Sequence, residues 1–582
     1  MRALQVLGLL ASTAWVLVSG QNNTNQCTTT YKADAMPGGT FQPYEYLNPV
    51  VGKLTTRFFV TIVNLTPHRF KLDGVDAKKM EGFDFGDVPP GRARQNPVNF
   101  RDFLWPLDDD GQARYTVEGA GKTFVVHASS RRRDDPRRVT FDLGGLGLGS
   151  REYVFPGGRT SVTLVITGSR AYGFRASLSH GPGNWMRQIY DVIKDRPIRH
   201  LVMPGTHDAG MSTISNKLIS IGSSQNTQNQ ALNIYDQLRA GSRWFDLRIG
   251  TVHPVNERDP NKHEGFWVMH INNEMADIAV GNTGESLDQV IDEINRFTRE
   301  NPGEIIFFAI RYLVGRYRIP DRGPIMWTES VVNQFFSKLR GITNRCPNLD
   351  TSTGFQNHKA SYYMDRNGGN GCVVLLLNGR LPDNVPKESP QDGIYSFSRI
   401  GVRDHWSNKM HAADMAPHQV RVWREVTRGG KDDFGQLLIS QWLVTPDPVA
   451  ATAYTLENFA IEPTNPSLYW YGVNGMDPKH WPNVILVDYI GVVKEDQWGW
   501  DQLSAELYTL ALGLNLYMVS ENCDIQKGAP PLIAKRGSTE LPLLTAAQSN
   551  STADKTKQGT VSRGLNRPRY PPQLSRRYQP RR

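Results

Sequence analysis

The stretch IIFFAIRY, residues 305–312, decides the fold class of this chain. It is almost continuously apolar, rich in branched and aromatic residues, and its charged residue, Arg311, stands near its end. A strand that is apolar on both faces is typical of a parallel sheet covered by helices on both sides. Residues 286–299 precede it with apolar side chains at helical spacing. We therefore predict alternating helices and strands around this stretch.

Seven other apolar stretches and a second helical segment, residues 329–339, continue the pattern. The stretches are residues 198–203 (IRHLVM), 244–249, 266–270, 373–377 (VVLLL), 395–400, 437–443 (LLISQWL) and 484–489 (VILVDY). Eight strands that alternate with helices predict an α/β fold of the distorted (β/α)8 barrel type, with its chemistry at the C-terminal ends of the strands. An open, doubly wound sheet is the alternative that periodicity leaves open.

The chain before this region has a different rhythm. Between residues 27 and 183, short β-rich runs alternate with Gly and Pro, and no long helical period occurs. The runs are residues 58–63 (FFVTIV), 123–126, 138–141 and 160–166 (TSVTLVI). We predict a small all-β, sandwich-like domain at 27–183, followed by the barrel at 184–523.

Both ends of the chain are distinct from these domains. Residues 1–20 have a positive start, an apolar run and a small-residue end, which predicts a signal peptide and a secreted, extracellular protein. Residues 528–582 are rich in Pro, Ser, Thr and Arg and predict a disordered basic tail. Because this tail holds the excess of positive charge within the formal net charge of +9, the rest of the chain is near neutral and a nucleic-acid-binding core is not supported.

The chain contains 4 Cys residues and no CxxC spacing, which in a secreted protein favours disulfides over metal ligation. Three pairings are possible. We expect Cys346–Cys372, which closes a local loop, and then Cys27–Cys523. Three sequons, at Asn22, Asn64 and Asn550, fit a secreted glycoprotein but also occur often by chance.

Polar residues gather at the ends of the predicted strands. A lone strand-end His is more often a hydrogen-bonded structural residue than a catalytic one. Two His together with carboxylates and Arg at successive strand ends are much harder to obtain by chance. These residues are His207 and Asp208 after the first strand, Asp246 and Arg248 in the second, His270 in the third, Arg311 in the fourth and Asp488 in the eighth.

Several motifs resemble the phosphatidylinositol-specific phospholipase C X-domain superfamily, and most closely its metal-independent bacterial-type branch. The motifs are PGTHDAG (204–210), GSRWFDLR (241–248), VMH (268–270), NPGEIIFFAIR (301–311) and PNVILVDYI (482–490). The whole chain also looks like fungal secreted members that place a β-rich segment before the X domain. The resemblance implies a distorted (β/α)8 barrel, in agreement with the strand count.

The resemblance implies a phosphoric diester hydrolase that cleaves a phosphoinositide-like phospholipid at a membrane surface. His207 would be the general base and His270 the general acid, because imidazole titrates near neutral pH. Asp488 would orient the base, Asp208 would support the acid, and Arg248 would hold the phosphoryl oxygens. Arg311 stands where the family has a Lys that contacts the head group, and we also expect Asp246 near the substrate.

No metal or other cofactor is expected, because Arg248 stands where calcium-dependent members have an acidic ligand. Asp208 and Asp246 leave a weak metal site open. Two alternatives therefore stand beside the first hypothesis. One is a metal-dependent barrel phosphodiesterase of the glycerophosphodiester or sphingomyelin type. The other is a catalytically silent lipid- or glycan-binding protein.

Overall fold

The computed structural model describes residues 56–80, 83–100, 108–130, 137–155, 160–169, 173–179, 181–215, 218, 226–318, 323–428, 433–446, 455–477, 479–492 and 504–518. The predicted signal peptide 1–20, the Cys27–Cys523 pair, the sequons at 22 and 550 and the tail 528–582 lie outside these residues. The domain boundaries stay predictions. Within the described residues, no helix is both long and apolar enough to cross a membrane.

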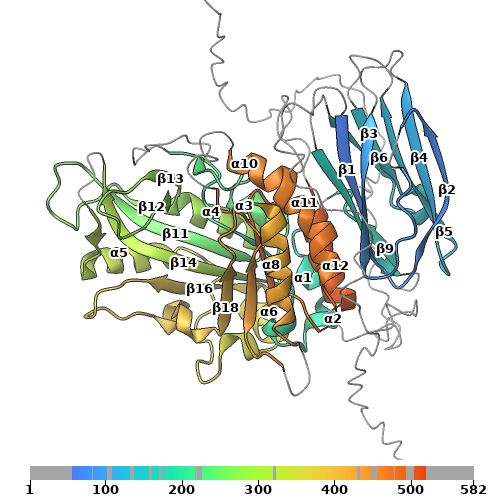
Figure 1. Cartoon of the computed structure of the whole chain (residues 1–582). Helices are drawn as coiled ribbons and strands as arrows, with labels where there is room; N and C mark the ends of the chain where they lie inside the picture. Colours follow the sequence, from blue (N-terminus) through green and yellow to red (C-terminus); the bar gives the residue numbers. More distant parts are fainter. Residues whose placement is uncertain are drawn as a thin grey trace, which may run out of the picture. The chain divides into compact units, whose positions relative to one another are not determined.

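The N-terminal part is a sandwich of two β-sheets, as predicted (Figure 1). One sheet has the order β3 (Arg92–Phe100), β1 (Thr56–Leu65), β8 (Thr160–Ser169) and β9 (Gly173–Ala176). The other has the order β2 (Phe70–Lys78), β4 (Asp109–Val117), β5 (Lys122–Ser130), β6 (Arg137–Asp142) and β7 (Ser150–Phe155). Side chains of both sheets form one apolar core, in which the rings of Tyr115 and Phe124 stack 4.9 Å apart. A short 3-10 helix, Gly144–Leu146, lies between β6 and β7.

The sequon at Asn64 falls inside this sandwich. The Asn64 side chain is fully buried, and its Nδ2 donates to the carbonyls of His68 at 2.7 Å and Val88 at 2.9 Å. A glycan on Nδ2 would replace one of its two hydrogens and so remove at least one of these bonds, and the sugar could not be accommodated in the core. The folded sandwich is therefore incompatible with glycosylation at Asn64.

The second part is a barrel of parallel strands in cyclic order. Each barrel strand except β17 pairs with the next barrel strand along the chain, and the last, β20, pairs with the first, β10. Among the described residues, β17 and β18 are the neighbours without a ladder, so the barrel has one open seam. The strands are β10 (Met203–Thr206), β11 (Trp244–His253), β14 (Glu304–Tyr317), β16 (Gly371–Gly379), β17 (Ile394–Ser396), β18 (Val402–Trp406), β19 (Leu437–Gln441) and β20 (Val484–Val487).

The structure confirms the predicted barrel but corrects three of its strands. Residues 266–270 belong to β12 (Phe266–Ile271), which runs antiparallel to β11 and forms a ribbon with β13 (Gly281–Ser286) outside the barrel. β11 instead pairs directly with β14, and the strand that completes the eight is β18, which follows β17 in the chain and pairs with β19. The residues of β18 are all partly or fully exposed, so it has no apolar run. The first strand begins at Met203 rather than 198, and only part of 395–400 is a strand, because 3-10 helices occupy Ile198–His200 and Phe397–Arg399.

Helices cover the outside of the barrel, and both predicted helices are present. α4 (Leu287–Glu300) begins at Ser286, whose Oγ accepts a hydrogen bond from the backbone N–H of Gln289, and α5 begins in the same way at Thr328. Their buried faces pack on the outward side chains of β11 and β14. The helices are α1 (Trp185–Gln188), α2 (Tyr190–Ile193), α3 (Ile234–Arg239), α4, α5 (Glu329–Leu339), α6 (Ala360–Met364), α7 (Arg366–Gly369), α8 (Ala412–Arg424), α10 (Leu456–Phe459), α11 (Asn465–Ser467), α12 (Val473–Gly475) and α13 (Glu506–Gly513).

Short 3-10 and π segments lie between the helices and strands of the barrel region. Two π turns join α10, α11 and α12 into one winding helical stretch, and a third follows α13. β15 (Ile325–Met326) extends the end of β14 as a short antiparallel pair. The remaining segments are the 3-10 turns Phe355–Asn357 and Pro390–Asp392 and the π turns Ala460–Thr464, Leu468–Gly472 and Leu514–Met518.

The expected Cys346–Cys372 disulfide is present, with the two Cα atoms 5.2 Å apart. Cys372 lies near the start of β16, and Cys346 lies in the segment that precedes it. The backbone N–H of Cys346 donates to the carbonyl of Val373 at 3.1 Å, so the bridge joins backbones that already contact each other. Both sulfurs are buried in the core of the barrel interior.

A fully buried ion pair fixes the lower end of the barrel. Arg243, just before β11, bonds the Glu304 carboxylate at the start of β14 with Nε–O 2.7 Å and Nη2–O 2.6 Å. Glu304 also accepts the backbone N–H of Arg187 at 2.9 Å, and burial raises the pKa of Glu304. The pair therefore joins two strands to the segment that leads into the barrel.

We expect Glu304→Gln to lower the free energy of unfolding by about 3–5 kcal/mol, because it leaves the buried Arg243 guanidinium without its counter-charge. Denaturant unfolding followed by circular dichroism measures this loss. The matched control is Glu425→Gln, which breaks the exposed pair Arg403–Glu425 and should cost less than about 1 kcal/mol. Equal losses in both variants would contradict the role assigned to Glu304.

Candidate active site

Alternation along the barrel strands delivers the predicted residues to one place. Inward side chains near the strand starts are apolar, as Met203, Trp244, Phe307 and Val484 are, and they form the interior core. Two to four positions further along, the same inward face carries charged residues, because side chains two apart on a strand share a face. The charged residues brought together in this way are His207 after β10, Asp246 and Arg248 on β11, Arg311 on β14 and Asp488 after β20.

The Arg248 guanidinium lies at the centre of this cluster. Its Nε is 2.7 Å from Asp208 Oδ1, and its Nη2 is 3.1 Å from Asp246 Oδ2. Nη2 also donates to Nε2 of His207 at 2.8 Å. Burial disfavours its charge, but the two carboxylates outweigh burial and raise the pKa of Arg248. The guanidinium is therefore a fixed positive charge that contacts both buried carboxylates and the imidazole.

His207 is held from both sides. Its Nδ1 is 2.9 Å from Asp488 Oδ1. Because Nε2 accepts from Arg248, Nδ1 carries the proton and donates to Asp488, so the imidazole in this arrangement is neutral. Burial lowers the pKa of His207, but Asp208 and Asp488 outweigh burial, and the net pKa is raised above 6.5.

His270 reaches the cluster from β12 rather than from the barrel. Its Nδ1 is 2.6 Å from Asn229 Oδ1 and 3.3 Å from Asp208 Oδ2. Burial lowers the pKa of His270, and the attraction of Asp208 offsets this only in part. The two imidazoles thus have pKa values displaced in opposite directions.

Arg311 is engaged by two carboxylates. Its Nε is 2.9 Å from Asp246 Oδ1, and its Nη2 is 2.6 Å from Asp404 Oδ2 on β18. Gln441 on β19 donates to the other oxygen of Asp404 at 2.7 Å. The neighbouring Arg311 and Arg248, acting against burial, hold the pKa of Asp246 down to about 2. These contacts give Arg311 and Asp246 a clear structural role, and their contact with substrate stays a prediction.

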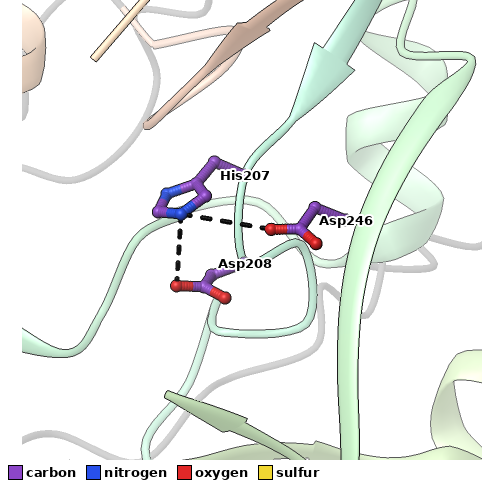
Figure 2. Close-up of side chains that lie close together, drawn as sticks. All are labelled: His207, Asp208 and Asp246. Atoms are coloured by element: carbon purple, nitrogen blue, oxygen red, sulfur yellow. Dashed lines mark ion pairs between the residues drawn. The ribbon is translucent and has the colours of Figure 1, made fainter. Parts of the chain in front are cut away.

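A group that could hold a metal ion is present, formed by His207, Asp208 and Asp246, whose ligand atoms lie within 4.8 Å of one another (Figure 2). The distances from His207 Nε2 are 3.6 Å to Asp208 and 4.0 Å to Asp246. All three side chains, however, already contact the Arg248 guanidinium. A cation bound by these three side chains would be repelled by the positive charge of Arg248. The group therefore does not fit a metal ion while Arg248 occupies the position described here.

The backbone around the site adopts conformations that L-residues rarely occupy. Asp208 has φ 43° and Tyr489, next to Asp488, has φ 52°. Tyr312 and Leu313 have φ 71° and 62° where β14 bulges against β11. At this bulge the Tyr312 ring lies beside Arg248, and the guanidinium carbon Cζ of Arg248 is 5.6 Å from the centroid of the ring. Such positive φ values concentrate at sites where surrounding contacts fix a side chain.

Four residues of the site were not predicted from the sequence: Asn229, Tyr312, Asp404 and Gln441. Asn229 lies in the polar run NTQNQ (226–230), which reads as an ordinary loop. Asp404 lies on β18, which the apolar pattern did not predict. Gln441 is the last residue of β19, which the apolar pattern did predict. Gln441 lies inside the predicted stretch 437–443, where a polar side chain within an apolar run is the signal that could have found it.

Comparison with known proteins gives weak but consistent matches. No family model matches the chain. A PI-PLC X-box domain-containing protein of Dictyostelium discoideum is 23% identical over 215 residues, which is 34% of this chain and 25% of that protein. A second X-domain protein of that organism is 33% identical over 97 residues, and human PI-PLC X domain-containing protein 3 is 26% identical over 153 residues, 42% of its length. The chain thus spans less than half the length of these relatives.

Solved structures give a similar picture. A variant of the phosphatidylinositol-specific phospholipase C from Staphylococcus aureus covers 58% of this chain, with 14% identity and a TM-score of 0.39. This likeness is too low to carry an argument about chemistry. The sequence matches to named X-domain proteins nevertheless confirm the resemblance to the PI-PLC X-domain superfamily.

Proposed function

We propose that this relative of PI-PLC X-domain proteins is a phospholipase C-type phosphodiesterase that cleaves a phosphoinositide-like phospholipid by general acid/base catalysis with two histidines and without a metal. The observation that carries the proposal is the pair His207 and His270. The Nδ1 of His207 is bonded to Asp488, and the Nδ1 of His270 is bonded to Asn229. Arg248 contacts His207 and the carboxylate of Asp208.

His207 is suited to the role of base. In the first step its Nε2 takes the proton of the inositol 2-hydroxyl, whose oxygen attacks phosphorus. Asp488 favours the imidazolium that forms, because Nδ1–H already donates to its carboxylate at 2.9 Å. Arg248 Nη2 must leave Nε2 before this step, since Nε2 accepts from it in the described arrangement.

His270 is suited to the role of acid. As the bond between phosphorus and the diacylglycerol oxygen breaks, protonated His270 gives its Nε2 proton to that oxygen. The products are a cyclic inositol phosphate and diacylglycerol, and the protons balance because one imidazole gains what the other loses. The lowered pKa of His270 makes its protonated form a stronger acid than ordinary imidazolium.

Arg248 supports the reaction without a metal ion. A planar guanidinium binds two phosphoryl oxygens at once, and its fixed charge offsets the negative charge that grows on them. Asp208 orients the Nε edge at 2.7 Å. A metal-dependent phosphodiesterase is the second candidate: it would require Arg248 to move away so that His207, Asp208 and Asp246 could bind a cation, and chelation distinguishes the two.

We also propose secretion and a transient contact with the membrane surface. Residues 1–20 and the Cys346–Cys372 disulfide support secretion. Large apolar side chains are exposed near the C-terminal end of β18, where Trp406 is 50% and Met410 is 40% exposed. Active sites of such barrels lie at this end of the strands, so these side chains would face a lipid surface together with the site.

We expect His207→Ala and His270→Ala each to lower the rate of phosphatidylinositol cleavage in vesicles by about 10²–10⁴-fold, because each removes one proton-transfer partner. The double variant should be little worse, since groups that act as a unit do not add. The matched control is His480→Ala, which removes another His paired with an Asp, at 2.8 Å, outside the site. Activity that chelator abolishes and Ca²⁺ restores would contradict the metal-free mechanism.

We expect kcat/KM to follow a bell-shaped pH profile. The active form needs neutral His207 and protonated His270, and the pKa of the base lies above that of the acid. With the two pKa values in this order, kcat/KM rises with pH up to the pKa of His270, which lies below 6.5. It falls again at pH values above the pKa of His207, which lies above 6.5. Asp488→Asn should move the alkaline limb to lower pH, since it removes a charge that raises the pKa of His207. An alkaline limb that stays in place would refute the assignment.

We expect Trp406→Ala combined with Met410→Ala to weaken binding to phosphatidylinositol vesicles about tenfold or more, because burying one such side chain in an apolar phase is worth roughly 1.5–3 kcal/mol. Vesicle sedimentation measures the binding. Val75→Ala in the sandwich, where Val75 is 41% exposed, is the matched control and should have no effect. Unchanged binding in the double variant would reject this contact surface.

A further inference from the structure

Asn229 lies between the two histidines and is almost fully buried, with 1% of its surface exposed. Its main chain is fixed by two segments of the site. The N–H of Asn229 donates to the carbonyl of Met211 at 3.2 Å, and its own carbonyl accepts the N–H of Tyr489 at 2.8 Å. The backbone that carries the Asn229 side chain is therefore held by the segments that follow β10 and β20.

The chemistry of its neighbours determines which way the Asn229 amide faces. One amide atom is 3.0 Å from Asp488 Oδ1, and the other is 2.6 Å from His270 Nδ1. An ionised carboxylate only accepts hydrogen bonds, so the atom beside Asp488 is the donor Nδ2. The opposite orientation would bring two oxygens to within 3.0 Å of each other without a proton between them.

This orientation dictates the proton on His270. The Oδ1 of Asn229 is an acceptor only, so the Nδ1 of His270 must carry a hydrogen. The nitrogen of His270 that gains and loses a proton is then Nε2. His207 has the same arrangement, since its Nδ1–H donates to the same oxygen, Asp488 Oδ1, at 2.9 Å.

We propose that Asn229 is a positioning residue that links His270 to Asp488. Its Nδ2 donates to Asp488 Oδ1, and this leaves its own oxygen as the acceptor for the Nδ1–H of His270. Through this amide, one carboxylate oxygen fixes both imidazoles in the Nδ1–H tautomer and leaves both Nε2 atoms available to the substrate. The effect on turnover rests on the proposed two-histidine reaction. The tautomer of His270 does not depend on it.

Asp208 is the competing partner of His270, with Oδ2 at 3.3 Å from Nδ1. The contact with Asn229 is shorter, at 2.6 Å, and Asp208 is also engaged by Arg248 Nε at 2.7 Å. The residue that the sequence resemblance assigns to support His270 is thus accompanied by a closer one. A substitution of Asn229 separates the two.

The test is ¹⁵N NMR of the histidine rings in the full chain at a pH where His270 is neutral, because the two ring nitrogens differ in shift when one is protonated. In the unsubstituted chain we expect His207 and His270 both as Nδ1–H. In Asn229→Leu, His270 should become a mixture of tautomers while His207 stays Nδ1–H. The matched control is Asn483→Leu, which removes a buried Asn bonded to Arg199, Leu201 and Leu438 at the other end of the barrel.

A second variant covers a failure of Asn229→Leu to fold, which circular dichroism would reveal. Asn229→Ala removes the acceptor for His270 without adding volume, so His270 should again become a mixture of tautomers while His207 stays Nδ1–H. A merely structural role predicts neither result. His270 that remains wholly Nδ1–H in Asn229→Leu, or that is Nε2–H in the unsubstituted chain, would overturn the proposal.

Activity separates this inference from the proposed function. In Asn229→Leu, kcat/KM for phosphatidylinositol should fall about 10- to 100-fold, by analogy with the loss of partners that orient metal-bound histidines. A released tautomer in a chain that cleaves no phospholipid would leave the inference standing and remove the function. If Asn229→Leu keeps full activity and His270 keeps its Nδ1–H tautomer, the proposed function stands and the inference about Asn229 fails.

Discussion

The Arg248 guanidinium balances the charges on which the rest of the site depends. Asp208 and Asp246 have side chains that are 0% and 3% exposed, and burying two carboxylates this close together is unfavourable unless a positive charge lies between them. Arg248 supplies that charge through contacts of 2.7 and 3.1 Å. Because the same group, in the middle of β11, also donates to His207 at 2.8 Å, the charge balance of the site and the position of this histidine depend on one side chain.

The barrel makes this arrangement possible through the simple geometry of strands. On β11, Trp244 fills the interior core, and Asp246 and Arg248 follow on the same face. The register places Asp246 beside Ala309 and Arg248 beside Arg311, so a small side chain leaves room where the carboxylate lies. The apolar floor excludes water below the charged layer, and ion pairs in such a layer are stronger than they would be at a surface.

The sequence predicted what depends on apolar periodicity and on motifs, and it missed what depends on long-range pairing. The seven predicted site residues lie together because they follow or end apolar stretches. The region 266–270 was assigned to the barrel because β12 is as apolar as a barrel strand, and only its pairing with β11 and β13 reveals a separate ribbon. β18 was missed because a strand beside an open seam buries few apolar side chains. Asp404, which lies on β18, was therefore missed as well. Asn229 has no local signal, since its importance comes from partners 41 and 259 residues away.

The open seam between β17 and β18 gives the barrel an unequal stiffness around its circumference. At the paired junctions, rows of main-chain hydrogen bonds hold neighbouring strands at about 4.8 Å. On the β18 side, the strand is held across the interior by the charge contact between Arg311 and Asp404, and by Gln441. Charge contacts between partly exposed side chains weaken with ionic strength, whereas ladders do not. We therefore expect the barrel wall beside Asp404 to be less rigid than the paired junctions and to loosen as the ionic strength rises.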